Sequence, residues 1–188
     1  CTSLEENRTG WSHQTYPEYL AASWLARQHI HDSELLTLLT PAEDPEHVAP
    51  PYYELASWLA SLRAGVFERL VATQPQSLLH SDSPSDFAWR ERVCASLLGQ
   101  CANDRIHRIP WREETYVGLG HPGLAGQLRP YISNRECNLA VRQVALLMAR
   151  SCQVRELAPL LLEKTLDPSE YVKIRETASG TLLDIADK

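Results

Sequence analysis

Apolar side chains recur at helical spacing along almost the whole chain, and no alternating run is long enough to build a sheet. The clearest of these runs carries four apolar side chains at positions i, i+3, i+4 and i+7: Leu55, Trp58, Leu59 and Leu62. Such spacing places apolar side chains on one face of a helix, and that face is buried when it packs against other helices. We therefore predict an all-α fold.

The segment around residue 15 contains the signals of a firmly capped helix. Thr15 and Glu18 have the spacing of a capping box, in which each side chain bonds the backbone amide of the other residue. Pro17 falls in the first turn, where its missing N–H would have no helical partner. One face of this helix carries aromatic and aliphatic side chains: Tyr16, Tyr19, Leu20 and Trp24.

Changes of pattern divide the rest of the chain. The proline-rich stretch 41–51 predicts a connector, whereas 103–120 shows no periodic face and predicts a long irregular loop. We predict four regions: 1–30, the end of one domain and a linking helix; 31–102, a helical region; 103–120, the loop; and 121–188, helical repeats.

The last third of the chain contains an internal repeat. The segment 128–132 recurs as 157–161, while Val141–Ala145 recurs as Ile174–Ala178, 33 positions later, as does Asn134 as Asp167. Residues 167–170 have the composition of a second capping box, with Pro168 predicted at the first helical position. Repeated helix pairs of this kind cannot bury a whole face alone, so they stack and leave a concave surface.

The repeated segment Ile174, Arg175, Ala178 and Leu182 resembles the second helix of HEAT or PBS-lyase-type repeats, which reads VRxxAxxxL. This resemblance implies a right-handed α-solenoid of HEAT-like helix pairs. Such a surface is expected to bind a protein or a small-molecule ligand. The same arginine pattern at Arg142 and Arg175 implies bonds within or between helix pairs.

A second resemblance concerns the first half of the chain. The string from His13 to Ala22, HQTYPEYLAA, resembles the FxHxTFxEYLAA segment that closes the winged helix of NACHT-type STAND NTPases, bacterial relatives of NOD-like receptors. The later stretch Glu54–Ala60, ELASWLA, followed by Pro75 and by residues 78–82, resembles the helical region that follows the winged helix in the same family.

The NACHT resemblance implies a function. The chain would run from the end of the winged helix into a sensor array, which binds a ligand and controls an oligomerisation switch driven by ATP and ADP in signalling or defence. His13 would contact the phosphates of ADP held by an upstream ATPase domain, with Mg²⁺ as the expected ion. The alternative is a stand-alone HEAT-repeat scaffold for protein–protein interactions.

Charge and composition narrow the classes of function and the cellular locations that remain possible. A net charge of −6 disfavours a general nucleic-acid binder, because phosphate neutralisation supplies most of that affinity. No apolar stretch is long enough to span a bilayer and no secretion signal is found, so we predict a cytoplasmic protein without a membrane partner. Because the chain begins with Cys1 rather than Met, we interpret it as a segment of a longer protein.

Few residues suggest catalysis or metal binding. The chain has no GxxxxGK[ST] or GxGxxG motif, so we expect no nucleotide chemistry, no cofactor and no enzymatic activity from this segment alone. His29 and His31 would point apart on a helix, and the five cysteines are widely spaced, so we predict neither a metal site nor a disulfide framework. Cys94 and Cys101, seven positions apart, are predicted to be core residues.

One basic cluster contains an aromatic side chain, and it is the candidate partner patch: Arg105, Arg108, Trp111 and Arg112. Guanidinium groups and an indole face suit a phosphate or an acidic partner. The alternative is a solvated loop whose arginines pair with the neighbouring acids Asp104, Glu113 and Glu114.

Overall fold

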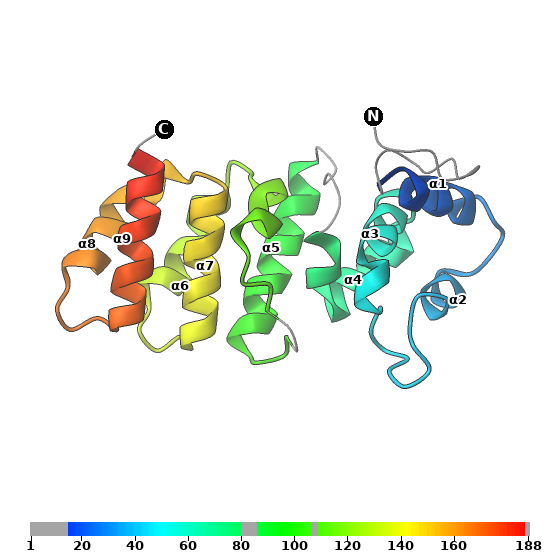
Figure 1. Ribbon diagram of the computed structural model, residues 1–188, viewed down its shortest axis with the longest axis horizontal. Helices are drawn as coiled ribbons and strands as arrows, with labels where there is room; N and C mark the ends of the chain where they lie inside the picture. Colours follow the sequence, from blue (N-terminus) through cyan, green and yellow to red (C-terminus); the bar gives the residue numbers. More distant parts are fainter. Residues whose placement is uncertain (1–14, 80–85, 107–108, 187–188) are drawn as a thin grey trace, which may run out of the picture.

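The computed structural model describes residues 15–79, 86–106 and 109–186, and every regular element in these ranges is a helix. The all-α prediction is therefore confirmed. The elements, in chain order, are α1 (Thr15–Ala26), α2 (Asp32–Thr37), η1 (Pro50–Tyr52), α3 (Tyr53–Leu62), α4 (Ala64–Thr73), η2 (Pro75–Leu79), α5 (Phe87–Ala102), η3 (Glu113–Leu119), α6 (Leu124–Ser133), α7 (Leu139–Ser151), η4 (Arg155–Leu157), α8 (Ala158–Leu166) and α9 (Val172–Ala186). They form a row, with α1 and α2 at one end and α8 and α9 at the other (Figure 1).

Helix α1 packs against α3, but only one of the side chains that the sequence places on one face, Tyr19, meets an aromatic ring of α3. Tyr16, Leu20 and Trp24 are 59%, 47% and 63% exposed, whereas Ala22 is fully buried. A small side chain at the contact lets two helices approach closely. The side chain of Thr15 lies outside the described residues, and with it the predicted capping box.

The connector 41–51 is anchored to the core by one buried side chain. The amide group of Gln74 accepts from the backbone N of Val48 at 2.7 Å and donates to the carbonyl O of Val48 at 3.1 Å. Its nitrogen also donates to the hydroxyl of Tyr53 at 2.9 Å. Val48 is itself buried, so this stretch is ordered by hydrogen bonds that the composition does not reveal.

The predicted irregular loop 103–120 is wrong in its second half. Residues 113–119 form the 3₁₀ helix η3, which packs against α5 and α7 and buries Tyr116 and Leu119. In a 3₁₀ helix, side chains three positions apart lie above one another. Tyr116 and Leu119 follow that spacing, but two buried residues in a seven-residue element are too few to show a periodic face in the sequence.

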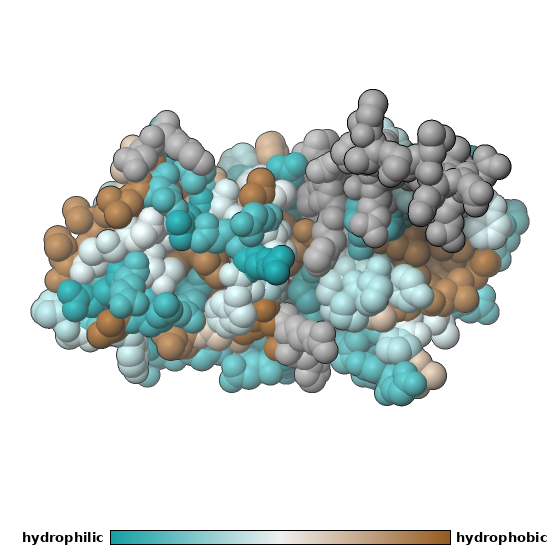
Figure 2. Space-filling model, viewed as in Figure 1, coloured by the Kyte–Doolittle hydropathy of each residue, from teal (hydrophilic) through white to brown (hydrophobic). Residues whose placement is uncertain are grey.

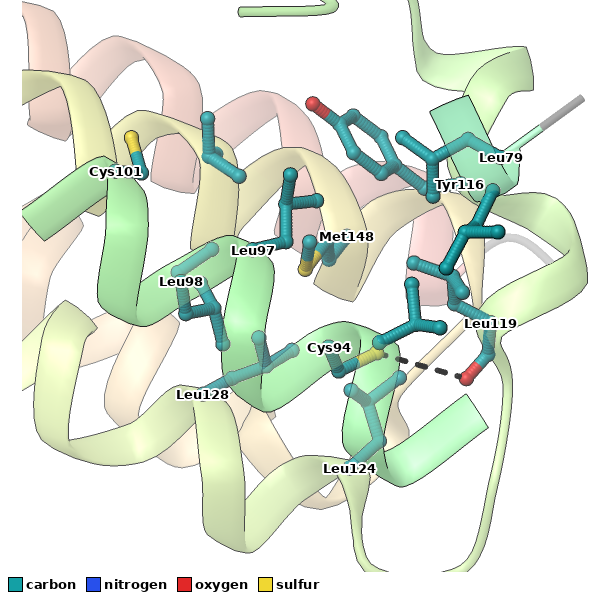
Figure 3. Packing of buried hydrophobic residues seen from close by; sticks show 14 of the residues in the cluster. Leu79, Cys94, Leu97, Leu98, Cys101, Tyr116, Leu119, Leu124, Leu128 and Met148 are labelled. Carbon is teal, nitrogen blue, oxygen red and sulfur yellow. Dashed lines mark hydrogen bonds between the residues drawn. The ribbon is translucent and has the colours of Figure 1, made fainter. Parts of the chain in front are cut away.

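The centre of the core lies where α5, η3 and α7 meet. Figure 3 shows Leu97 of α5 beside Met148 of α7, with Tyr116 of η3 next to them. Cys94 and Cys101 are buried, as the sequence predicts. These residues belong to one connected hydrophobic cluster whose members run from Ala22 to Ile185.

The repeat is present as two helix pairs, α6/α7 and α8/α9, in a constant 33-residue register. Asn134 and Asp167 end the first helix of each pair, and Leu139 and Val172 begin the second. In this register Leu128 corresponds to Leu161, which is also fully buried, and not to the residue at 157 as the sequence suggested. The two alignments differ by four residues, about one helical turn, so both keep the same face.

The second predicted capping box, at residues 167–170, is also wrong. Helix α9 begins at Val172, and Asp167 instead accepts from the backbone N of Ser169 at 2.9 Å. Glu170 is turned inward, and its carboxylate accepts from Arg142. A buried guanidinium binds a carboxylate more strongly than an exposed backbone amide does, which accounts for the different use of this glutamate.

Candidate partner-binding site

The described part of the candidate patch consists of Arg105, Trp111 and Arg112. All three side chains are exposed, Trp111 by 51%, on the segment that connects α5 to η3. His13, the predicted nucleotide sensor, and Arg108, the fourth patch residue, lie outside the described residues.

The start of this segment is fixed by the end of α5. Asp104 adopts a left-handed backbone conformation with φ of 54°, which ends the helix. The side-chain nitrogen of Asn138, at the beginning of α7, donates to the carbonyl O of Cys101 at 3.0 Å and of Ala102 at 3.1 Å. It also donates to the carboxylate of Asp104 at 3.1 Å, so α7 holds the point where the patch begins.

The far end of the segment is fixed by the end of α7. The guanidinium of Arg150 bonds the carboxylate of Glu113, and the hydroxyl of Ser151 donates to the carbonyl O of Glu113. The thiol of Cys152 donates to the carbonyl O of Tyr116 at 3.2 Å. The hydroxyl of Tyr116 donates in turn to the carbonyl O of Pro110, just before the patch residue Trp111.

These contacts determine which acidic side chains near the patch can pair with its arginines. Two of the acids expected to neutralise it have other partners, since Glu113 pairs with Arg150 and Asp104 accepts from Asn138. In the described ranges, neither Arg105 nor Arg112 forms an ion pair. The patch therefore offers two exposed guanidinium groups and an indole, which can bind carboxylates, phosphates or another aromatic ring.

The most buried ionic contact of the described chain joins the two helix pairs. Arg142 and Glu170 have side chains that are 1% and 0% exposed, and two hydrogen bonds of 2.9 and 2.7 Å connect them. Arg142 also donates to the carbonyl O of Ile132 at 3.1 Å. The bonds from Arg142 hold the pKa of Glu170 below its usual range. The prediction that Arg142 bonds within or between helix pairs is thus confirmed. Its partner Glu170, however, was predicted to be part of a helix cap.

The buried thiols have little nucleophilic character. Burial raises the pKa of Cys101 and of Cys152 to about 11, and raises that of Cys94 further. A thiol must be ionised to attack, so these three are protonated near neutral pH. His107, the histidine nearest to Cys101 in sequence, is outside the described ranges.

A hollow lies at the α2 end of the molecule, between α2 and α4. Its volume is about 430 Å³, and apolar walls alternate with hydroxyl groups and charged side chains. Its lining includes Asp32, Leu36, Thr37, Glu46, Arg69 and Leu70. The hydroxyl of Thr37 donates to the carbonyl O of Ser33 within α2.

The described residues contain neither a metal-binding group nor a membrane-spanning helix. No group of three or more His, Cys, Asp or Glu side chains is arranged to hold a metal ion there. No described helix combines the length and apolar character needed to cross a bilayer.

The two segments that carry the NACHT resemblance lie against each other. Tyr19 of α1 meets Trp58 of α3 edge to face, with ring centroids 5.1 Å apart and planes at 76°. Arg63, at the end of α3, donates to the carbonyl O of Ala26 and of Ile30, both at 3.1 Å, and so fixes the end of α1. Compared with known proteins, the chain matches no family model, no curated protein and no solved structure.

Proposed function

We propose that this chain is the sensor and regulatory region of a NACHT-type STAND NTPase. On this proposal it runs from the end of a winged helix into a right-handed solenoid of HEAT-like helix pairs. The solenoid binds a ligand or a protein, and the intact protein forms an oligomer under the control of bound ATP or ADP with Mg²⁺. The segment itself carries out no catalysis, and the protein acts in the bacterial cytoplasm.

The observation that carries this proposal is the contact between α1 and α3. The two stretches that resemble the family are about forty residues apart in sequence. They nevertheless form one packed unit through Tyr19 and Trp58, with Arg63 bonding the end of α1. Two independent motifs that fold together support a common origin better than either motif alone.

The candidate patch supports a partner-binding role. Arg105, Trp111 and Arg112 project from a segment that α7 fixes at both ends, through Asn138 and Arg150. A rigid support lowers the entropy cost of binding. A ligand held there can shift the switch only if it contacts the closed and open states differently.

The test uses the intact protein with its upstream ATPase domain. His13→Ala is expected to speed the release of a fluorescent ADP analogue and to promote oligomer formation, because a phosphate contact is lost. The matched control is His29→Ala, which changes an exposed histidine after α1. Equal ADP release from the His13→Ala variant and the unchanged protein would refute the sensor role. An open reading frame without an ATPase domain would refute the family assignment.

A stand-alone interaction scaffold is the second candidate, and one observation favours it. The described helices share one buried hydrophobic cluster whose members run from Ala22 to Ile185, as expected of a scaffold with a core of its own. The scaffold hypothesis predicts that the isolated chain binds its partner with the same affinity in the presence and absence of nucleotide. The NTPase hypothesis predicts that affinity in the intact protein depends on which nucleotide is bound.

A further inference from the structure

The contact between the two helix pairs follows a definite pattern. In the first pair, Arg142 on α7 donates to the carbonyl O of Ile132 at the end of α6. The same guanidinium bonds the carboxylate of Glu170, which lies in the loop before α9 and therefore belongs to the second pair. The arginine thus connects its own pair to the pair that follows.

The second pair repeats the first half of this pattern. Arg175 stands 33 positions after Arg142, and its Nε donates at 3.3 Å to the carbonyl O of Thr165, which stands 33 positions after Ile132. Arg175 is only half-buried, and no described carboxylate forms an ion pair with it. The place that Glu170 takes beside Arg142 thus has no described counterpart beside Arg175.

Exposed apolar side chains of the second pair occupy the positions that, in the first pair, contact the pair that follows. Arg129 of the first pair donates to a carbonyl of η4, and Arg150 bonds Asp184 on α9. The residues 33 positions later are Leu162 and Leu183, which are 48% and 61% exposed. Leu166, next to this area on α8, is 68% exposed, and Figure 2 shows hydrophobic surface at the α8 end of the molecule. Exposed leucines in a group indicate an interaction surface.

We propose that the outer face of the α8/α9 pair is a docking face for a third helix pair of the same 33-residue class, stacked in line with the first two. Its loop places a carboxylate beside Arg175, in the way that Glu170 lies beside Arg142. It carries an apolar side chain where the second pair has Asp184, because it meets Leu183 and not an arginine. This inference deepens the proposed function, since it rests on the chain being part of a repeat array.

The experiment extends the full chain by a copy of residues 154–186, joined directly after residue 186. In the copy Asp184→Leu is made, so that an apolar side chain meets Leu183. In the extended chain, the backbone amides of α9 are expected to exchange hydrogen at least about tenfold more slowly than in the unextended chain. A charge-assisted bond is added there and exposed leucines become buried. Glu170→Gln in the appended copy alone, or Arg175→Gln, is expected to remove most of that protection.

The matched control is Glu163→Gln in the appended copy, which changes a glutamate whose side chain is 64% exposed and should leave the protection intact. Unchanged exchange in the extended chain would overturn the proposal, and so would equal losses from the Glu170→Gln and Glu163→Gln changes. Light scattering of the unextended chain provides a further check. A dimer that Leu183→Glu dissociates would show that a second copy covers this face and would also overturn the proposal. No nucleotide is present, so failure here is distinct from failure of the His13→Ala test.

Discussion

Two arginine–glutamate pairs in this chain have nearly the same geometry but opposite exposure, and they allow a sharp prediction. Arg142 and Glu170 are 1% and 0% exposed, and their two bonds measure 2.9 and 2.7 Å. Arg92 and Glu68 are 49% and 58% exposed, and their two bonds measure 2.7 and 2.6 Å. The difference between the effects of Glu170→Gln and Glu68→Gln therefore reports burial, with the chemistry held constant.

Glu170→Gln keeps the shape of the side chain and one acceptor oxygen, but it leaves the guanidinium of Arg142 buried without its anionic partner. We expect a loss of about 3 kcal/mol in the free energy of unfolding, near the lower end of the range for breaking a buried pair. For a chain of this length the loss corresponds to a midpoint decrease of roughly 6–12 °C. Glu68→Gln is expected to cost much less than Glu170→Gln, because water screens the exposed pair.

The pH dependence adds an independent check. The bonds from Arg142 lower the pKa of Glu170 in the folded chain relative to the unfolded chain. This contribution to stability is therefore fully present above about pH 5 and is lost as the pH falls through the lowered pKa. The difference in stability between the unchanged protein and Glu170→Gln should accordingly shrink in acid.

Urea unfolding followed by circular dichroism measures the loss, and hydrogen exchange of α8 and α9 amides locates it. A double replacement, Arg142→Met with Glu170→Leu, should recover much of the loss, because a buried pair can be replaced by apolar side chains at little cost. The assigned effect of burial is contradicted if Glu170→Gln lowers the free energy of unfolding no more than Glu68→Gln does. It is also contradicted if the stability difference between the unchanged protein and Glu170→Gln stays the same in acid.

Three further predictions concern single side chains. Gly65→Ala should cost about 1–3 kcal/mol, because the added Cβ would overlap a carboxylate oxygen of Asp32 and displace that side chain from its ion pair with Arg63. Gly126→Ala, with nothing within 4 Å, should stabilise α6 by about 0.5–1 kcal/mol, and thermal unfolding compares the two variants. Gln74→Ala should cost about 1–3 kcal/mol by leaving buried backbone groups of the connector unpaired, which urea unfolding measures; a cost near zero would contradict the anchoring role. Burial raises the pKa of Cys152 to about 11, so this thiol should react with iodoacetamide at pH 7 more slowly in the native chain than in urea. Mass spectrometry measures the two rates, and equal rates would contradict the burial of this thiol.

The sequence alone determined the fold class and most of the buried faces. The seven-residue spacing of Cys94 and Cys101 predicted that both are core residues, and both are buried in α5. The 33-residue repeat predicted the two helix pairs, and the arginine pattern predicted that Arg142 bonds within or between them; it does both. These features depend on contacts between residues close in sequence, which periodicity records.

The tertiary structure decided which face of α1 is buried, where η3 enters the core and what Glu170 does. Tyr16 and Trp24 have helical spacing yet remain exposed, whereas Ala22 is fully buried and Tyr19 meets Trp58 of α3. Glu170 has the sequence position of a cap, but a buried guanidinium 28 residues earlier binds it more strongly. Likewise, the charge of the patch at Arg105 and Arg112 depends on Glu113 having been taken by a residue of α7. Local patterns cannot specify these outcomes, because each one is a competition between a near neighbour and a partner that only folding brings close.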